Sequence, residues 1–401
     1  MQGLTVFCIL FVLTLFFLIR TKDFFHPSTI ICLEWLLIAG LYLFTNHGLF
    51  ELSNKTYSII FLWVTLFSFV AYFFSKNNFY IKPKYRIIQA NQDFIKKLYS
   101  PLLIANIFLV FTIIMTYGFS FSLIRIGMLK YVPIYVKLLF YINTFSYAYF
   151  AVICFSKEFS VTKIFIFALF IIITSFFKVN KTTFISFFLL ILFVLKERKI
   201  LTIRNFLLLF CTTSLLLYAI MSLRGDKGTF IDFSLWKYLA IYLLSPLTAF
   251  NEVVQQKITI PEHLFGSYCF NFLHKIFALF TDEKIEIFGP WVNVPLPTNV
   301  FTVFAPAYID FGFLGIILLA IIQGYVWGFI YSFVKRNFLI FKVIYGTLLY
   351  YLGLQFFSDY FSYSFSVFIQ YIIFSIFLVV KITETKYFSF YIANNKSRLK
   401  E

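Results

Sequence analysis

The chain has 401 residues, of which 61% are hydrophobic and only 13% are charged, and its mean hydropathy is +0.89. This balance excludes a soluble globular protein and indicates a polytopic membrane protein. The formal net charge of +17 would suggest nucleic acid as a partner of a soluble protein. Here most of the excess lies in short loops between apolar runs, where it sets orientation, so we expect no nucleic-acid partner.

The sequence has no recognisable metal or nucleotide motif. Its five cysteines form no Cys-x-x-Cys pair, and its four histidines lack metal-ligand spacing. There is also no Gly-rich phosphate loop, Walker motif or Rossmann fingerprint. We therefore expect no metal, no other cofactor and no disulfide framework, and an ATP-driven pump is disfavoured.

Apolar runs recur along the whole chain. A bilayer core of about 30 Å needs roughly 20 apolar residues in a helix. We predict an all-α fold with about eleven transmembrane helices, near residues 4–19, 29–45, 57–75, 101–118, 134–155, 161–177, 182–195, 204–222, 311–334, 339–357 and 363–381. The first run is followed, not preceded, by basic residues, so we interpret it as a span and not as a cleaved signal.

The positive charges predict the orientation. The loops 76–97 and 196–204, the residues after the ninth run and the C-terminal tail are rich in Lys and Arg. All of them fall on one side of an eleven-span chain, which predicts that this side is cytoplasmic and that the N-terminus lies outside.

These patterns divide the chain into four parts. We predict an N-terminal transmembrane bundle of about eight spans (1–222), a large periplasmic loop (223–310), C-terminal transmembrane helices (311–381) and a basic cytoplasmic tail (382–401). The loop contains two apolar helical stretches, near 235–255 and 264–280. Pro246 interrupts the first stretch and His274 and Lys275 the second, so both suit interfacial or re-entrant helices.

Residues 289–310 differ most from the rest of the chain. Four prolines, several polar amides, a tyrosine and a carboxylate come directly before the ninth run. Proline removes backbone donors and fixes φ, so we expect no regular helix here. Irregular backbone at membrane depth is tolerated only inside protein or along a wet cavity. The stretch is therefore a candidate wall of a site; the alternative is a Pro-rich loop with Asp310 as the N-cap of the next helix.

Two motifs in this half of the chain resemble those of the oligosaccharide repeat-unit polymerases (O-antigen polymerases, Wzy type). One is Pro-Thr-Asn-x-Phe-Thr at 297–302, followed by Tyr-x-Asp-Phe-Gly-x-x-Gly at 308–315. The other is the run 238–252, which contains Ser-Pro-Leu-Thr-Ala-Phe-Asn-Glu. The spacing of spans around one long loop is also similar. The resemblance implies a GT-C-like helical bundle in which the long loop caps a lipid-accessible cavity.

Several basic residues fall on the predicted outer side, where orientation does not require them. Basic groups near the membrane that do not serve orientation suggest an anionic ligand, here a lipid-linked pyrophosphate, because Arg offers a planar fork and Lys a mobile point charge. The alternative is that they extend to ordinary lipid headgroups. The candidates are Arg224, Lys227, Lys178, Lys181 and Arg125.

Carboxylates and sugar-binding side chains complete the candidate site. Asp310 and Glu252 are the candidate general bases for an attacking sugar hydroxyl; the alternatives are capping and a solvated helix face. His263 and His274 are weaker candidates. Trp291 could stack on a pyranose ring, and three residues could hydrogen-bond to sugar hydroxyls or serve as loop scaffolding: Asn299, Thr298 and Tyr308.

The late spans contain small and polar residues as well. Gly324 and Gly328 form a Gly-x-x-x-Gly pattern, which we interpret as helix packing and not as chemistry. Four polar residues in or beside these spans either face the bundle interior or line a lipid groove: Gln323, Gln355, Asp359 and Gln370.

The resemblance implies a metal-independent membrane glycosyltransferase that polymerises undecaprenyl-pyrophosphate-linked oligosaccharide repeat units into an O-antigen or capsule-type polysaccharide. It implies a multi-pass protein of the bacterial inner membrane, with its active site on the periplasmic face. A chain-length regulator and a flippase of the same pathway are possible partners. Two alternatives stay open, namely a flippase or transporter of lipid-linked glycans and an O-antigen ligase-like transferase.

Overall fold

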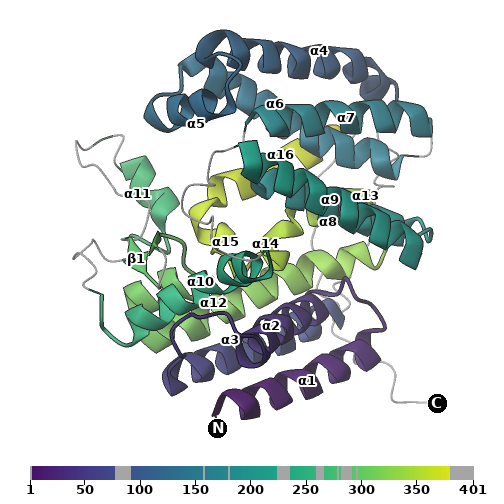
Figure 1. Ribbon diagram of the computed structural model, residues 1–401. Coiled ribbons are helices and arrows are strands. Elements are labelled where there is room, and N and C mark those ends of the chain that lie inside the picture. Colours follow the sequence, from purple (N-terminus) through teal and green to yellow (C-terminus); the bar gives the residue numbers. More distant parts are fainter. Residues whose placement is uncertain are drawn as a thin grey trace, which may run out of the picture.

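The computed structural model describes residues 2–76, 92–156, 159–178, 181–223, 235–258, 266–277, 280, 291–294 and 297–379. Helices dominate it (Figure 1). Within these residues, six helices are long and apolar enough to cross a membrane: α1 (Gln2–Thr21), α2 (Pro27–Phe44), α3 (Asn54–Lys76), α4 (Gln92–Tyr117), α6 (Ile134–Phe155) and α12 (Phe304–Val334).

The remaining predicted runs also contain helices, which confirms the all-α membrane fold. They are shorter: α7 (Val161–Phe177), α8 (Lys181–Glu197), α9 (Ile203–Leu223), α13 (Leu339–Leu348) with α14 (Tyr350–Gly353), and α16 (Phe365–Val379). Four further helices lie outside the predicted runs or between them: α5 (Phe121–Lys130), α10 (Leu235–Val254), α11 (Asn271–Phe277) and α15 (Tyr360–Tyr363).

The helices form two groups that are joined by a central layer (Figure 1). Helices α1, α2, α3 and α12 pack together on one side, and α4 packs against α6 and α7 on the other. Helices α13 and α16 lie between the groups, since α13 contacts both α12 and α6. Helices α5 and α11 and strand β1 (Val292–Asn293) lie at the same end of the molecule, which we call the loop face (left in Figure 1).

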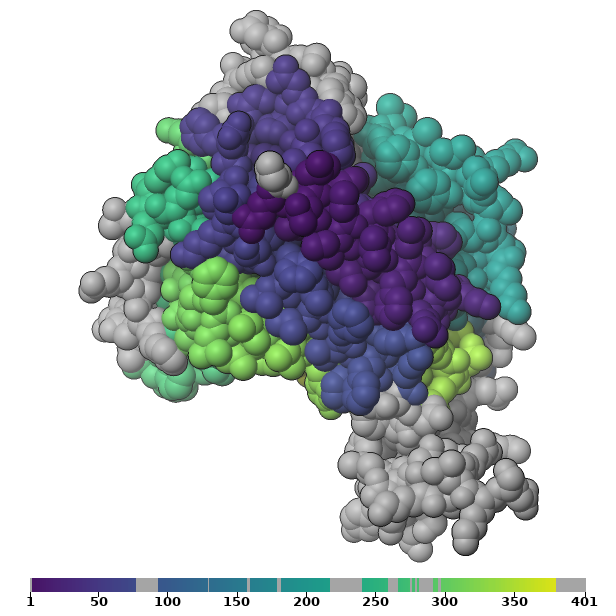
Figure 2. Space-filling model, turned by 90° about the horizontal axis from the view of Figure 1, so that it is seen from below, coloured from purple at the N-terminus to yellow at the C-terminus, as the bar shows by residue number. Residues whose placement is uncertain are grey.

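Helix α1 lies on the outside of the bundle. Figure 2 shows it as a dark purple ridge beside the blue α3, with the green α12 next to α3. Its outward side chains are apolar, among them Leu4, Phe11, Val12 and Ile19, which are all exposed. An exposed apolar surface of this kind fits contact with lipid, in agreement with the predicted first span.

Close packing of α3 on α12 depends on two glycines. A Cβ atom on Gly324 would lie 2.8 Å from the backbone oxygen of Phe67, and one on Gly328 would lie 2.5 Å from that of Ala71. Any side chain there would collide with the α3 backbone. The Gly-x-x-x-Gly pattern thus serves helix packing, as the sequence predicts.

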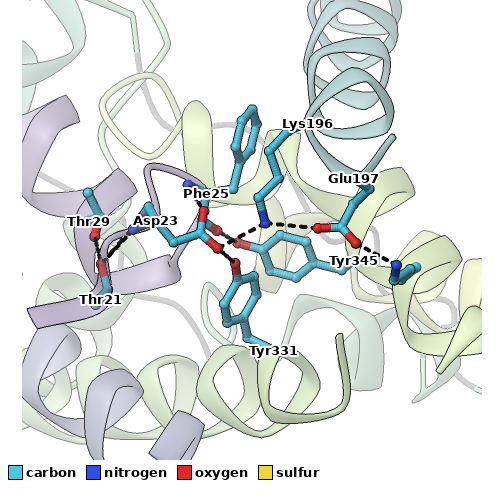
Figure 3. Close-up of polar contacts among 9 residues, drawn as sticks. Thr21, Asp23, Phe25, Thr29, Lys196, Glu197, Tyr331 and Tyr345 are labelled. Atoms are coloured by element: carbon cyan, nitrogen blue, oxygen red, sulfur yellow. Dashed lines mark hydrogen bonds and ion pairs between the residues drawn. The ribbon is translucent and has the colours of Figure 1, made fainter. Parts of the chain in front are cut away.

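The opposite end of the molecule carries a cluster of charged and tyrosine side chains (Figure 3), which we call the basic-face cluster. Asp23, just after α1, accepts hydrogen bonds from Lys196 Nζ at 2.9 Å and from the Tyr331 hydroxyl. Glu197 pairs with Lys196 and with Lys342. The ends of α1, α8 and α12 and the start of α13 therefore meet, and these are the ends that the charge pattern assigns to one side.

Helix α12 differs from the prediction at its start. It begins at Phe304 and not near residue 311, because Pro306 lies in the first turn, where a helix needs no backbone N–H. Gly312 then kinks the helix with φ 60° and ψ −143°, a conformation open only to glycine. The expectation of irregular backbone up to residue 310 is wrong from Phe304 onward. The alternative of Asp310 as N-cap is wrong too, since Val303 is the N-cap residue.

The first helical stretch of the loop also differs from the prediction. Helix α10 runs unbroken through Pro246, and its residues Leu244, Leu247 and Phe250 are fully buried, so it is built into the bundle. In the second stretch, only α11 and the preceding turn at 266–270 are described. That turn begins at Gly266, whose φ is +74°.

The tenth and eleventh predicted spans form a broken hairpin. Helices α13 and α14 together cover 339–353, about 22 Å at 1.5 Å per residue, which is less than the roughly 30 Å of a bilayer core. Residues 354–359 are not helical, and they form the tip of the hairpin. Gln355 and Asp359 in this tip are 0% and 1% exposed, so the tip lies inside the protein.

Candidate functional site

A cavity of about 200 Å³ lies between α10, the strand pair β1 and β2, and the tip of the α13–α16 hairpin. Apolar and aromatic side chains form most of its wall, with a few hydroxyl and amide groups among them. Its described lining residues are Ile241, Tyr242, Ser245, Pro246, Trp291, Pro297, Thr298, Asn299, Val300 and Phe357.

The strand pair positions three of the predicted sugar-binding residues. Strand β1 pairs antiparallel with β2 (Pro297–Thr298), and Val292 lies opposite Thr298. Val292 and Val294 are buried and anchor the pair, whereas the neighbouring Trp291 is 71% exposed. The structure therefore brings Trp291, Thr298 and Asn299 together at one cavity, although they were predicted only from an irregular stretch.

Helix α10 forms the second wall. Pro246 has no N–H, so it cannot donate to the carbonyl of Tyr242 one turn earlier, and the helical hydrogen-bond ladder is interrupted where both residues line the cavity. Beyond this point Asn251 holds the helix in place. Its Oδ1 accepts hydrogen bonds from Ser53 N at 2.7 Å and Thr56 Oγ1 at 2.8 Å, at the start of α3.

The hairpin tip forms the third wall. Phe357 lines the cavity, and its ring centre lies 5.4 Å from that of Tyr242. Helix α15, which follows the tip, contacts the start of α8, where Thr182 Oγ1 lies 3.3 Å from the Tyr360 hydroxyl. The cavity is thus bounded by three segments that are distant in the sequence.

Tyr308 is not among the lining residues. Its ring packs against Phe250 and Phe313, with ring centres 5.6 Å and 5.9 Å away. Lys55 Nζ lies 5.5 Å from the ring centres of both Tyr308 and Phe313. Lys55 is a cation on the loop face that the sequence analysis missed. Its position just before the third predicted span, on the predicted outer side, could have identified it.

Asp310 is bound to the backbone of a distant segment. Its Oδ2 accepts a hydrogen bond from Cys269 N at 2.7 Å, and its Oδ1 one from Tyr268 N at 3.4 Å. The carboxylate therefore holds the turn before α11 against the first part of α12. It does not belong to the cavity lining.

Glu252 forms an ion pair at the end of α10. Its Oε1 accepts from Lys257 Nζ at 3.3 Å, and its side chain is 8% exposed, compared with 55% for that of Lys257. Neither Asp310 nor Glu252 contributes to the described lining, so the sequence prediction of a carboxylate base in the cavity wall finds no support there.

Among the predicted anion-binding residues, Lys178 is the best described. Its Nζ donates to Asn143 Oδ1 and lies 4.6 Å from the ring centre of Phe140. Burial lowers the pKa of Lys178 to about 8. Asn143 in turn donates to Asn106 Oδ1 at 2.8 Å, so Lys178 ends a chain of buried polar groups.

The other basic candidates are less well defined. Helix α5, which carries Arg125, packs against the end of α7 through Phe121 and Phe176, whose ring centres are 5.0 Å apart. Lys181 is the first residue of α8. Arg224, Lys227 and the weaker candidate His263 lie outside the described residues. His274 lies in α11.

A chain of buried polar side chains links the hairpin tip to α3 and α12. Trp63 Nε1 donates to Gln355 Oε1 at 2.9 Å, and Gln355 Nε2 donates to Gln323 Oε1 at 3.2 Å. Gln323 Nε2 then donates to Asp359 Oδ1 at 3.3 Å. Of the two alternatives for the polar residues of the late spans, these three therefore face the interior, while Gln370 is partly exposed.

Among the described residues, no group of three or more His, Cys, Asp or Glu side chains could hold a metal ion.

Two curated proteins are similar to this chain over part of its length. One is an O-antigen polymerase of Shigella dysenteriae, 32% identical over 126 residues that make up 31% of each chain. The other, from Escherichia coli strain K12, is described as a "Putative O-antigen polymerase" and is 28% identical over 155 residues, or 38% of this chain and 37% of that protein. The resemblance to the O-antigen polymerases is confirmed. The aligned region spans about a third of the length of either relative.

No family model and no solved structure matches the chain. The two stretches that carry the O-antigen polymerase resemblance in the sequence meet in the structure. Ile241, Tyr242, Ser245 and Pro246 of the first and residues 297–300 of the second line the same cavity.

Proposed function

We propose that this chain is a membrane glycosyltransferase that polymerises undecaprenyl-pyrophosphate-linked oligosaccharide repeat units into an O-antigen or capsule-type polysaccharide. The hydroxyl of an acceptor repeat unit attacks the anomeric carbon of the donor glycan, and the lipid pyrophosphate leaves. The single observation that carries the proposal is the convergence of both family-like motifs on one cavity at the loop face.

The cavity has suitable groups for a sugar. The exposed indole of Trp291 is a flat apolar surface on which the apolar face of a pyranose can stack. Ser245, Thr298 and Asn299 supply hydroxyl and amide groups, which can both donate and accept hydrogen bonds with sugar hydroxyls. A mostly apolar cavity with a few polar groups is the usual composition of a small-molecule site.

Cations on the loop face would stabilise the charge that develops on the leaving pyrophosphate. We assign this role first to Arg224 and Lys227, which follow the last residue of α9, Leu223, in the sequence. Lys178, Lys181 and Arg125 are the second group. Thr182, the residue after Lys181, lies 3.3 Å from the hydroxyl of Tyr360 in α15.

We assign the general base to Asp310 over Glu252. Glu252 is already neutralised by Lys257 at 3.3 Å. In the part of the chain that the structure describes, no Lys or Arg forms an ion pair with Asp310, so no such cation competes for a proton at its carboxylate. It belongs to the kinked first part of α12, where the second family-like motif continues.

The setting follows from the same proposal. The protein would span the bacterial inner membrane many times in a GT-C-like arrangement, and residues 223–310 would form a periplasmic loop over the active site. A flippase of the same pathway would deliver the lipid-linked units, and a chain-length regulator would limit the product. The basic-face cluster would lie on the cytoplasmic side.

A polysaccharide size profile from a strain that lacks this protein tests the proposal. Wild type should restore a ladder of lengths, and Arg224→Ala and Asp310→Asn should leave single repeat units on the lipid core. Loss of all units from the core, with long polymer still on the carrier lipid, would indicate a ligase instead. Accumulation of single units on the cytoplasmic leaflet would indicate a flippase and overturn the proposal.

A further inference from the structure

The hairpin tip at 354–359 poses a hydrogen-bonding problem. It is irregular backbone surrounded by apolar helices, and such a segment needs partners within the protein because neither lipid nor bulk water is available to it. The carbonyl of Gln355 is satisfied by Val303 N at 2.9 Å. Its side chain is held by Trp63 and Gln323.

The next residue depends on a carboxylate from another helix. Phe356 N donates to Glu34 Oε1 at 2.8 Å. Glu34 lies within α2, a helix that is otherwise apolar apart from its first residues. Its second oxygen, Oε2, is buried and has no hydrogen-bond partner among the described residues. A carboxylate in a membrane helix is costly, so this one needs a function.

The bond between Glu34 and Phe356 N lies one residue away in the chain from a lining residue of the cavity. Phe357, the next residue, forms the inner wall and packs against Tyr242 of α10. The position of the Phe357 ring therefore depends on where the Phe356 backbone is held.

We propose that Glu34 is a positioning residue for the cavity, which holds Phe357 in the inner wall by accepting the Phe356 N–H. The consequence for activity rests on the proposed function, whereas the structural part does not. The role needs only an acceptor, so Glu34→Gln should preserve it. Glu34→Leu, of similar size, should leave the Phe356 N–H unpaired, so that Phe357 is no longer held in the cavity wall.

A cysteine reporter tests the structural part directly. Phe357→Cys is placed in a variant whose five native cysteines are alanine, and its labelling by a membrane-impermeant maleimide is timed in the full-length protein. We expect Glu34→Leu to raise the labelling rate about tenfold, the size expected for one unpaired buried donor, and Glu34→Gln to change it less than about twofold. A second reporter, Leu10→Cys in the buried side of α1, reports loosening of the whole bundle.

An unchanged rate in Glu34→Leu overturns the proposal, and so does equal acceleration at Leu10→Cys or by Glu34→Gln. In a polymerisation assay, Glu34→Leu should raise the half-saturating acceptor concentration about tenfold with little change in the maximal rate, the signature of lost binding geometry. If the labelling pattern is as expected but the wild-type protein forms no polymer, the positioning role stands and the proposed function fails.

Discussion

The two ends of the molecule are built from different interactions. At the basic face, helix ends are joined by charged side chains. Asp23 binds Lys196 and the Tyr331 hydroxyl, and Glu197 pairs with Lys196 and Lys342 (Figure 3). At the loop face, the cavity is enclosed by aromatic rings and by hydrogen bonds between side chains and backbone, and its described lining contains no charged residue. At the basic face, charged side chains hold the helix ends together. At the loop face, the uncharged cavity wall leaves room for a ligand.

We expect the largest loss of stability from a substitution between α3 and α12, because this contact joins the two faces. Helices α3 and α12 run between the two faces and touch through Gly328, where a Cβ atom would lie 2.5 Å from the Ala71 oxygen. We expect Gly328→Ala to lower the free energy of unfolding by about 2–3 kcal/mol, since backbone must move apart. The measurement is thermal unfolding in detergent.

Gly40→Ala is the matched control for this prediction. Its Cβ atom would meet only the ring of Phe7, at 3.1 Å, and that side chain can move. It should change the free energy of unfolding by less than about 0.5 kcal/mol. Equal stability of the two variants would contradict the close packing of α3 on α12.

A smaller effect should be confined to the basic face. In the wild type, Lys196 Nζ lies 2.9 Å from Asp23 Oδ2. Asp23→Asn replaces this carboxylate by a neutral amide, so the negative charge that attracts the ammonium group of Lys196 is lost. We expect a loss of about 1–2 kcal/mol of stability, with unchanged activity per folded molecule. Asp93→Asn, at an exposed position in the first turn of α4, is the control and should be neutral. Lost activity in a fully folded Asp23→Asn variant would contradict the claim that the basic face serves stability and the loop face serves activity.

The smallest effect per step is the loss of stability for each pH unit at the same face. Burial, followed by repulsion from Lys335, lowers the pKa of His26 to about 3. This folded value lies below the ordinary one near 6.5, so the contribution of neutral His26 to stability is complete above pH 6.5 and is lost as the pH falls toward 3. The loss amounts to about 1 kcal/mol per pH unit below 6.5.

His26→Gln isolates this contribution. The amide can still accept from Ser28 N and donate to Ser75 Oγ, which His26 contacts at 3.2 Å and 2.7 Å. The unfolding temperature of wild type should fall more steeply between pH 6.5 and 4.5 than that of the variant. Parallel curves would show that His26 does not titrate in this way.

The sequence predicted the helices well and their interruptions poorly. A run of about twenty apolar residues admits one interpretation, whereas a break depends on contacts that are distant in the chain. Pro306 and Pro246 were expected to interrupt helices. Pro306 instead lies in the first turn of α12, and α10 stays helical through Pro246 while it packs on α2, α3 and α12. The tenth run was predicted to continue to residue 357, because Phe356 and Phe357 extend its apolar pattern beyond the point where the helix ends.

The candidate site was predicted in part for the same reason. Trp291, Thr298 and Asn299 stood out as polar or aromatic residues in a Pro-rich stretch, and the structure brings them to one cavity. The bond of Asp310 to the backbone at 268–269 could not be inferred, because backbone groups carry no sequence signal. Glu34 was visible as a lone acid in an apolar run, and its partner in the hairpin tip was not.

The central claim is that the cavity at the loop face binds the sugar during polymerisation. The most direct measurement is the polysaccharide ladder of a deletion strain that produces Trp291→Ala, beside Phe119→Ala as a control, which removes an equally exposed aromatic residue away from the cavity lining. At equal protein amounts and equal unfolding temperatures, Trp291→Ala should reduce the ladder to single repeat units, and Phe119→Ala should leave it intact. A full ladder from Trp291→Ala would contradict the account.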